Sequence, residues 1–93
     1  MSRNYLAFDL GASSGRAIIG KLDNGRLELT EVHRFQNGPI EKDGSLFWDF
    51  NAIGKEIKTG LSKAFELCAD IASVAVDTWG VDFVCFDSQG KML

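Results

Sequence analysis

Residues 5–22 read YLAFDLGASSGRAIIGKL, two short apolar runs separated by a loop of glycine and serine. The first run, Tyr5–Leu10, is apolar on both faces, and the second, Gly15–Leu22, is rich in isoleucine and alanine. Such runs favour buried β-strands over a helix, because each is short and bounded by turn residues. This stretch therefore predicts the first two strands of a sheet, joined by a loop with more polar groups than a plain turn needs.

A third strand is predicted after a tight turn. Asp23-Asn24-Gly25 is a strong hairpin signal, because asparagine and glycine tolerate positive φ. Arg26–Phe35 then alternates apolar and charged residues, with Leu27 and Leu29 on one face and Val32 and Phe35 expected to join them. Together the three strands predict an antiparallel meander. Residues 36–47 contain the only proline, Pro39, and are predicted to form a loop.

An amphipathic helix is predicted next, with Asp49 as its N-cap, Trp48 as an anchor beside the cap, and an end near Cys68. Gly54 and Gly60 each lower helix propensity by roughly 1 kcal/mol relative to alanine, so we expect tertiary packing to hold the helix. One apolar face recurs at three- and four-residue steps and comprises Phe50, Ile53, Ile57, Leu61, Ala64 and Phe65.

The remainder of the chain predicts two more strands, Ile71–Val76 and Phe83–Phe86, then a turn at residues 87–90 and the start of another strand at Lys91–Leu93. A helix between the meander and a buried fourth strand predicts a parallel addition to the sheet. The fold class is therefore α/β with a mixed sheet. One helix covers one face, so we expect further protein to cover the other.

Composition and charge exclude several classes of function. The chain has 93 residues and a formal net charge of −3, which excludes a general attraction to nucleic acid or an anionic membrane. No apolar run approaches the ~20 residues of a membrane span, and the N-terminus does not read as a signal peptide. Cys68 and Cys85 lack metal-ligand spacing and are predicted to be free thiols in the core of a cytoplasmic protein. His33, the only histidine, is predicted to be a structural or surface residue.

Residues 9–16, DLGASSGR, carry the strongest candidate chemistry. Gly11 and Gly15 permit backbone conformations closed to other residues, so successive amides could cradle phosphate oxygens. Ser13 and Ser14 add hydroxyl donors, and Arg16 adds a planar cation that suits phosphate.

Asp9 fits beside a phosphate only with a cation between them, and Mg²⁺ held through its waters by one carboxylate meets that need. The loop lacks the Gly-Lys-Ser/Thr ending of a Walker A motif. A glycine- and serine-rich turn with an incidental acid and base remains the alternative interpretation.

Three separated stretches carry a resemblance to a known family. FDLGASSGRAIIG at residues 8–20, EVHRFQNGPI at residues 31–40 and DTWGVDFVCFD at residues 77–87 resemble the FGGY carbohydrate kinases, and most closely their L-rhamnulose kinases. The resemblance spans essentially all 93 residues. The sequence departs from many family members at residues 11–13, where Gly-Ala-Ser replaces Gly-Thr-Ser or Gly-Thr-Thr.

The resemblance implies a site. The ATP phosphates would be bound by Ala12, Ser13, Ser14, Gly15 and Arg16, and Asp9 would position Mg²⁺. The ketose would meet the backbone of Gly80, with Trp79 and Asp82 in the same pocket. Two structural alternatives stay open: Trp79 as a core aromatic at a strand end, and Asp77 with Asp82 as caps of the turn at Gly80.

The resemblance also implies a ribonuclease H-like, actin-like ATPase fold, of which residues 1–93 would be the N-terminal part of the first kinase domain, a single incomplete domain. The activity would be ATP-dependent phosphorylation of L-rhamnulose to L-rhamnulose 1-phosphate. The general base and the adenine pocket would lie beyond Leu93, so no catalytic residue is assigned and these 93 residues alone are expected to be inactive. The remainder of the kinase chain would cover the open sheet face.

Three other functions stay open. The protein would be another FGGY ketose or polyol kinase, for L-fuculose or D-xylulose, if the pocket at TWGVD selects a different sugar. It would be a stand-alone, non-catalytic nucleotide-binding module if the natural chain ended at Leu93. An actin-like ATPase that drives assembly is the third, and the sugar-site resemblance at residues 77–83 argues against it.

Overall fold

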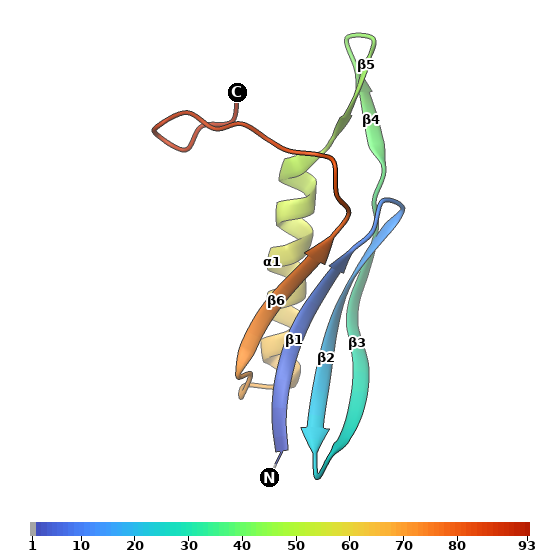
Figure 1. Cartoon of the computed structure of the whole chain (residues 1–93), viewed down its shortest axis with the longest axis vertical. Coiled ribbons are helices and arrows are strands. Elements are labelled where there is room, and N and C mark those ends of the chain that lie inside the picture. The colour runs from blue at the N-terminus through green and yellow to red at the C-terminus, as the bar shows by residue number, and fades with distance from the viewer. Residues whose placement is uncertain (1) are drawn as a thin grey trace.

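The mixed sheet predicted from the sequence is present in the computed structural model, which describes residues 2–93 (Figure 1). A four-stranded sheet is accompanied by one helix and a separate two-stranded hairpin. In chain order the elements are β1 (Ser2–Leu10), β2 (Ser14–Asp23), β3 (Arg26–Gln36), β4 (Pro39–Lys42), β5 (Ser45–Trp48), α1 (Phe50–Leu67) and β6 (Ser73–Thr78). No helix among the described residues has the length and hydropathy needed to cross a membrane.

The strand order in the sheet is β3-β2-β1-β6. The first three strands form the predicted antiparallel meander, and β6 adds parallel to β1 with Leu6 opposite Val74 and Leu10 opposite Thr78. A parallel neighbour requires a long crossover connection, and α1 supplies it. The carboxyl ends of β1 and β6 therefore lie at the same edge of the sheet (Figure 1).

Two hairpin turns share one conformation. Asn24 and Gly25 have φ values of 52° and 79°, and Asp43 and Gly44 have 52° and 78°. The prediction of a loop over residues 36–47 is therefore wrong, because Asp-Gly, like Asn-Gly, accepts positive φ at both turn positions and folds the flanking residues into β4 and β5.

A β-bulge divides β3 into two halves that face opposite ways. Ala17 pairs with His33 while Ile18 pairs with Glu31, so Val32 is the extra residue. Phe35 consequently packs toward the core, whereas Leu27 and Leu29 are 62% and 67% exposed. Val32 also packs against the core, so the expectation that one face would hold all four apolar side chains is wrong. The bulge reverses the alternation of side chains between the two halves.

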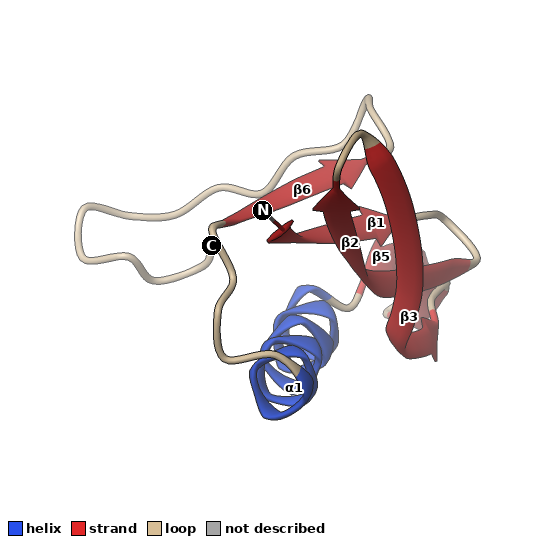
Figure 2. Cartoon of the chain, turned by 90° about the horizontal axis from the view of Figure 1, so that it is seen from below, coloured by secondary structure: helices blue, strands red, loops and turns tan. Residues whose placement is uncertain are grey.

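The core lies between α1 and one face of the sheet (Figure 2). It consists of Leu6, Phe8, Leu10, Ala17, Ile19 and Ala64. The predicted helix face is confirmed along its middle, but Phe50 and Phe65 at its two ends are 44% and 47% exposed. The opposite sheet face is open, with Ala7 and Ala75 exposed on β1 and β6.

The helix approaches the sheet most closely at Gly60. A Cβ atom at Gly60 would lie 2.7 Å from Phe8 Cε1 and 3.1 Å from Ala17 Cβ. Glycine therefore sets the spacing between α1 and the two central strands, which confirms the expected close approach at this position. At Gly54, no described neighbour lies within 4 Å of an added Cβ, so the same expectation is wrong there.

Polar contacts fix where α1 begins and which of its faces lies against β3. Asp49 is the predicted N-cap, and its Oδ1 accepts a hydrogen bond from the Ala52 amide at 3.0 Å. His33 on β3 lies between two helix residues, with Nε2 3.0 Å from Glu56 Oε2 and Nδ1 3.0 Å from Lys63 Nζ. Because a lysine ammonium can only donate, Nδ1 accepts and Nε2 carries the hydrogen. His33 thus has the predicted structural role.

The predicted strand Phe83–Phe86 does not form. Residues 83–86 do not add to the free edge of β6, and within residues 81–93 only Phe86 and Met92 make an isolated bridge. The turn predicted at residues 87–90 is present, with the Gly90 amide donating to the Asp87 carbonyl at 3.0 Å. Both cysteines are free thiols, but Cys85 is exposed and not part of the core.

We predict that Gly60→Ala lowers the free energy of unfolding by about 1–3 kcal/mol, because its methyl group overpacks Phe8 and Ala17. Gly54→Ala is the matched control in the same helix, and its Cβ meets open space. That variant should raise stability by up to about 1 kcal/mol through helix propensity alone. Urea unfolding of both variants measures this, and equal effects of the two substitutions would contradict the packing explanation.

Candidate functional site

The predicted phosphate loop at residues 9–16 and the predicted sugar segment at residues 77–83 lie side by side where they leave the sheet. Leu10 is the last residue of β1 and pairs with Thr78, the last residue of β6. Gly11 and Trp79 therefore begin their loops at neighbouring positions of one sheet edge (Figure 1). In open α/β sheets, ligands bind outside the carboxyl ends of the strands. This edge is the candidate site of the protein.

The loop between β1 and β2 is shaped by steric limits. The Gly11 amide donates to the Ser14 carbonyl at 2.9 Å, and a Cβ at Gly11 would lie 2.8 Å from that oxygen. At Gly15 a Cβ would lie 2.2 Å from the Phe35 ring across the strand pair. Neither glycine has positive φ, so the conformational reason expected from the sequence is wrong. Both positions need glycine for close approach instead.

Asn37, the residue directly after β3, binds this loop through two hydrogen bonds. Its side-chain Nδ2 donates to the Gly11 carbonyl at 3.0 Å, and its backbone amide donates to the Ser13 carbonyl at 3.0 Å. Two carbonyl groups of the loop are therefore engaged. Sequence reasoning missed this residue, and its only signal was an asparagine in the second stretch that carries the family resemblance, residues 31–40.

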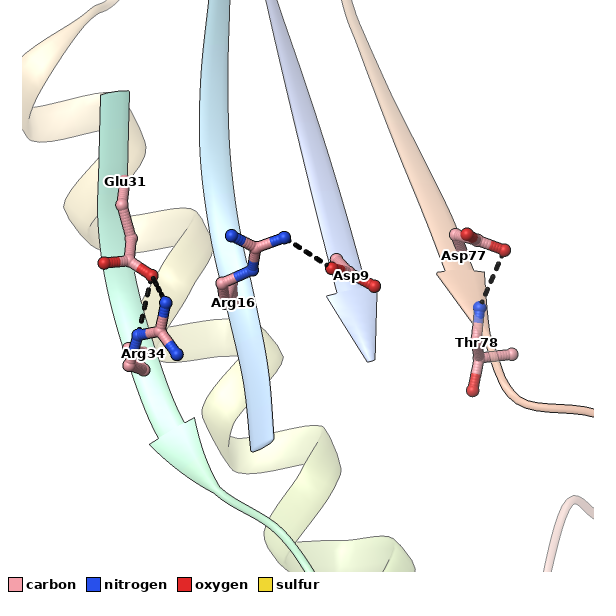
Figure 3. Close-up of polar contacts among 6 residues, drawn as sticks. All are labelled: Asp9, Arg16, Glu31, Arg34, Asp77 and Thr78. Carbon is pink, nitrogen blue, oxygen red and sulfur yellow. Dashed lines mark hydrogen bonds and ion pairs between the residues drawn. The ribbon is translucent and has the colours of Figure 1, made fainter. Parts of the chain in front are cut away.

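Charged side chains form a row across the open face of the sheet. In the strand register Arg34, Arg16, Asp9 and Asp77 are successive neighbours on β3, β2, β1 and β6 (Figure 3). Arg16 Nη2 lies 2.7 Å from Asp9 Oδ2, and Arg34 Nη2 lies 2.7 Å from Glu31 Oε1. The hydrogen bond to Asp9 is the main cause that raises the pKa of Arg16 above its ordinary value. The guanidinium therefore stays charged.

The acidic end of this row bears on the magnesium prediction. Asp9 and Asp77 are register partners in parallel strands, while the Arg16 ion pair engages Asp9 from the other side. No group of three or more potential metal ligands occurs within residues 2–93. One carboxylate acting through bound water is nevertheless a sufficient protein contribution for Mg²⁺ in phosphate sites. Asp9 and its surroundings thus fit an outer-sphere role.

The segment after β6 brings together two of the predicted sugar-site residues and one unexpected residue. Trp79 Nε1 donates to Asp82 Oδ2 at 2.5 Å, and Trp48 Nε1 at the end of β5 donates to the same oxygen at 2.9 Å. The two indole rings have centroids 4.5 Å apart. Trp79 also packs against the core, so its predicted structural and site roles are compatible. Neither Asp77 nor Asp82 caps the turn at Gly80, since Asp77 Oδ1 accepts from the Thr78 amide and Asp82 Oδ2 accepts from the two indoles.

Val81 adopts an unusual conformation in this segment. Its φ is 67°, in the left-handed region that a β-branched side chain rarely enters, and its side chain is fully exposed. Gly80 beside it has no neighbour within 4 Å of an added Cβ among the described residues. Residues 80–81 therefore make no packing contacts themselves within the described chain, and the turn that they form brings Asp82 into contact with the two indoles.

Two clefts of the described chain run along the N-terminal half of α1, and Gly80, Trp79 and Asp82 line neither of them. Asn37 lines the smaller of these clefts together with Phe35.

Comparisons with known proteins give a consistent result. No protein-family model matches the chain. The rhamnulokinase of Halalkalibacterium halodurans is 52% identical over 91 residues, which are 97% of this chain and 19% of that protein. Those of Bacillus subtilis and Bacteroides thetaiotaomicron are each 44% identical, over 96% and 100% of this chain and 18% and 19% of their own lengths. The resemblance to rhamnulokinases is therefore confirmed, and the chain spans about a fifth of their length.

Among solved structures, a member of the Ppx/GppA protein family from Aquifex aeolicus is similar with a TM-score of 0.58. Its sequence is 17% identical, and the match covers 84% of this chain and 26% of that protein. At this identity the similarity shows a shared fold alone. It agrees with a small α/β unit built on a mixed sheet.

We predict that Asn37→Ala loosens the loop between β1 and β2. The substitution removes the hydrogen bond to the Gly11 carbonyl, which is worth about 1 kcal/mol, and keeps the backbone bond to Ser13. Amide hydrogen exchange at residues 11–14 should become roughly fivefold faster. Asn51→Ala on the exposed face of α1 is the control and should leave those rates unchanged. Unchanged exchange rates in Asn37→Ala would show that the side chain of Asn37 does not hold the loop in place.

Proposed function

We propose that residues 1–93 form part of the first domain of a cytoplasmic, ATP-dependent carbohydrate kinase with the ribonuclease H-like fold. The reaction would transfer the γ-phosphoryl group of ATP to L-rhamnulose and give L-rhamnulose 1-phosphate. One observation carries this proposal: the parallel pairing of β1 with β6 brings the loop predicted to bind phosphate and the segment predicted to bind sugar to one sheet edge. The identity to rhamnulokinases over the whole chain supports the choice of substrate.

On the phosphate side, residues Ala12 to Arg16 would bind ATP. Asn37 occupies the carbonyls of Gly11 and Ser13, so the loop has fewer free acceptors to repel a phosphate. Ser13 and Ser14 would add hydroxyl donors. Arg16 uses one nitrogen for Asp9, which leaves other donors of the guanidinium for phosphate oxygens.

On the metal side, Asp9 would hold Mg²⁺ through bound water, with Asp77 alongside on β6. When bound, the ion neutralises charge on the transferring phosphoryl group. The ion pair of Asp9 with Arg16 would keep the carboxylate in place beside the loop.

On the sugar side, the backbone of Gly80 would contact the ketose, because any side chain there would occupy the space of the sugar. Trp79 would pack against the apolar face of the sugar, and Asp82 would accept hydroxyl hydrogen bonds. The relatives are about five times longer than this chain. We infer that the general base and the adenine pocket belong to the remainder of a longer protein, which would also cover the open sheet face.

The first test is an ADP-release assay on the complete gene product with MgATP. L-rhamnulose, L-fuculose, D-xylulose and glycerol are supplied in parallel, and we expect L-rhamnulose to be preferred. Preference for another sugar would support the kinase and the phosphate loop but reject L-rhamnulose as the sugar bound by the pocket. No turnover with any substrate would reject the kinase, and the 93-residue chain by itself should show none because phosphoryl transfer needs both sides of a closed cleft.

We also predict that Gly80→Ala raises the KM for L-rhamnulose by about tenfold, since a methyl group of this size typically costs a packed ligand about 1–3 kcal/mol. The fold should not change, because nothing in the described chain lies within 4 Å of the added Cβ. Gly54→Ala is the matched control, because the added Cβ is equally open there but lies on α1. It should leave the KM for L-rhamnulose and the KM for MgATP unchanged. A normal KM for the sugar in Gly80→Ala would remove Gly80 from the pocket.

A further inference from the structure

We propose that Trp48 is a further sugar-binding residue, and that its indole extends the aromatic surface that Trp79 and Asp82 begin. This inference rests on the proposed function and deepens it. Trp48 ends β5 and lies thirty-one positions before Trp79, so sequence spacing alone does not connect the two. The side-chain contacts connect them.

Both indoles converge on one carboxylate oxygen. Trp48 Nε1 donates to Asp82 Oδ2 at 2.9 Å, and Trp79 Nε1 donates to the same atom at 2.5 Å. The ring centroids are 4.5 Å apart and the ring planes are inclined by 43°. The shared acceptor holds the two N–H edges together, and the rings also contact each other directly. These three residues, Trp48, Trp79 and Asp82, are called the aromatic platform.

The exposure of the platform distinguishes it from core packing. Both indoles are only half-buried, and Asp82 is exposed. Asp82 Oδ1 makes no hydrogen bond within the described chain, so it can still accept one. The platform therefore combines two half-buried indole rings with a carboxylate oxygen that can still accept a hydrogen bond.

This combination matches the chemistry of a sugar. A ketose has patches of C–H groups, which pack on aromatic faces, and hydroxyl groups, which donate to a carboxylate. Two inclined faces contact more of such a molecule than one face does. They also set its orientation, because the C–H patch and the hydroxyl that meets Asp82 must be presented together.

The competing explanation is that Trp48 only positions Asp82 through its N–H group. Two substitutions separate the explanations. Trp48→Phe keeps an aromatic face and loses the N–H donor, whereas Trp48→Met keeps apolar volume and loses both the face and the donor. Direct contact predicts that only Trp48→Met weakens sugar binding strongly, whereas positioning predicts equal losses.

The experiment measures steady-state kinetics of the complete gene product with L-rhamnulose and MgATP. We expect Trp48→Met to raise the KM for L-rhamnulose about tenfold, Trp48→Phe less than about threefold, and neither to change the KM for MgATP. Phe47→Leu is the matched control, because Phe47 precedes Trp48 on the same strand, points to its other face and is 52% exposed. It should leave both KM values unchanged.

A direct measurement on the wild-type protein covers the case in which Trp48→Met does not fold. Fluorotryptophan is incorporated, and the fluorine resonance of Trp48 is assigned from its absence in Trp48→Phe. We expect this resonance to shift when L-rhamnulose is added without ATP. An unshifted resonance, a normal KM in Trp48→Met, or equal losses in both variants would overturn the inference. Wild-type protein that phosphorylates no ketose would overturn the proposed function itself, which is a distinct result.

Discussion

The parallel pairing of β6 with β1 is the constraint on which the candidate site depends. It requires a helical crossover that packs back onto the sheet, and the absence of a side chain at Gly60 lets α1 approach Phe8 and Ala17. Once Leu10 and Thr78 are partners, the loops that follow them must start at the same edge. A shift of one residue in this register would turn Asp9 and Asp77 to opposite faces of the sheet.

At that edge, contacts from β3 determine the shape of the loop more than its own backbone preferences do. Asn37 binds two of its carbonyls, and Phe35 fills the space that Gly15 leaves open. The bulge at Val32 is what allows this, because it turns Phe35 toward the core while Arg34 remains on the open face next to Arg16. The loop and its row of charges are therefore products of the meander as a whole.

Local signals in the sequence were sufficient for most of the elements. The first two apolar runs, the Asn24-Gly25 turn and the cap at Asp49 act within a few residues, and each formed as predicted. The hairpin at Asp43-Gly44 carries the same local signal as Asn24-Gly25, and Pro39 does not oppose it, because a strand accepts proline as its first residue. The strand predicted at residues 83–86 depends on a neighbour, and hydrophobicity alone cannot supply one. Likewise Asn37 and Trp48 reach the candidate site through contacts across 26 and 34 residues, which no spacing rule encodes.

The segment at residues 79–82 shows how an exposed turn can still be held in one conformation. Holding a β-branched residue such as Val81 at positive φ costs about 1–3 kcal/mol, and no packing of its side chain offsets this. Two hydrogen bonds to a carboxylate contribute about 1.5 kcal/mol each or somewhat less at an exposed site, so together they match that cost. Trp79 supplies one of the two bonds and Trp48 the other. The strain at Val81 and the shared acceptor at Asp82 are therefore two parts of one arrangement, which brings the two indoles together before any ligand arrives.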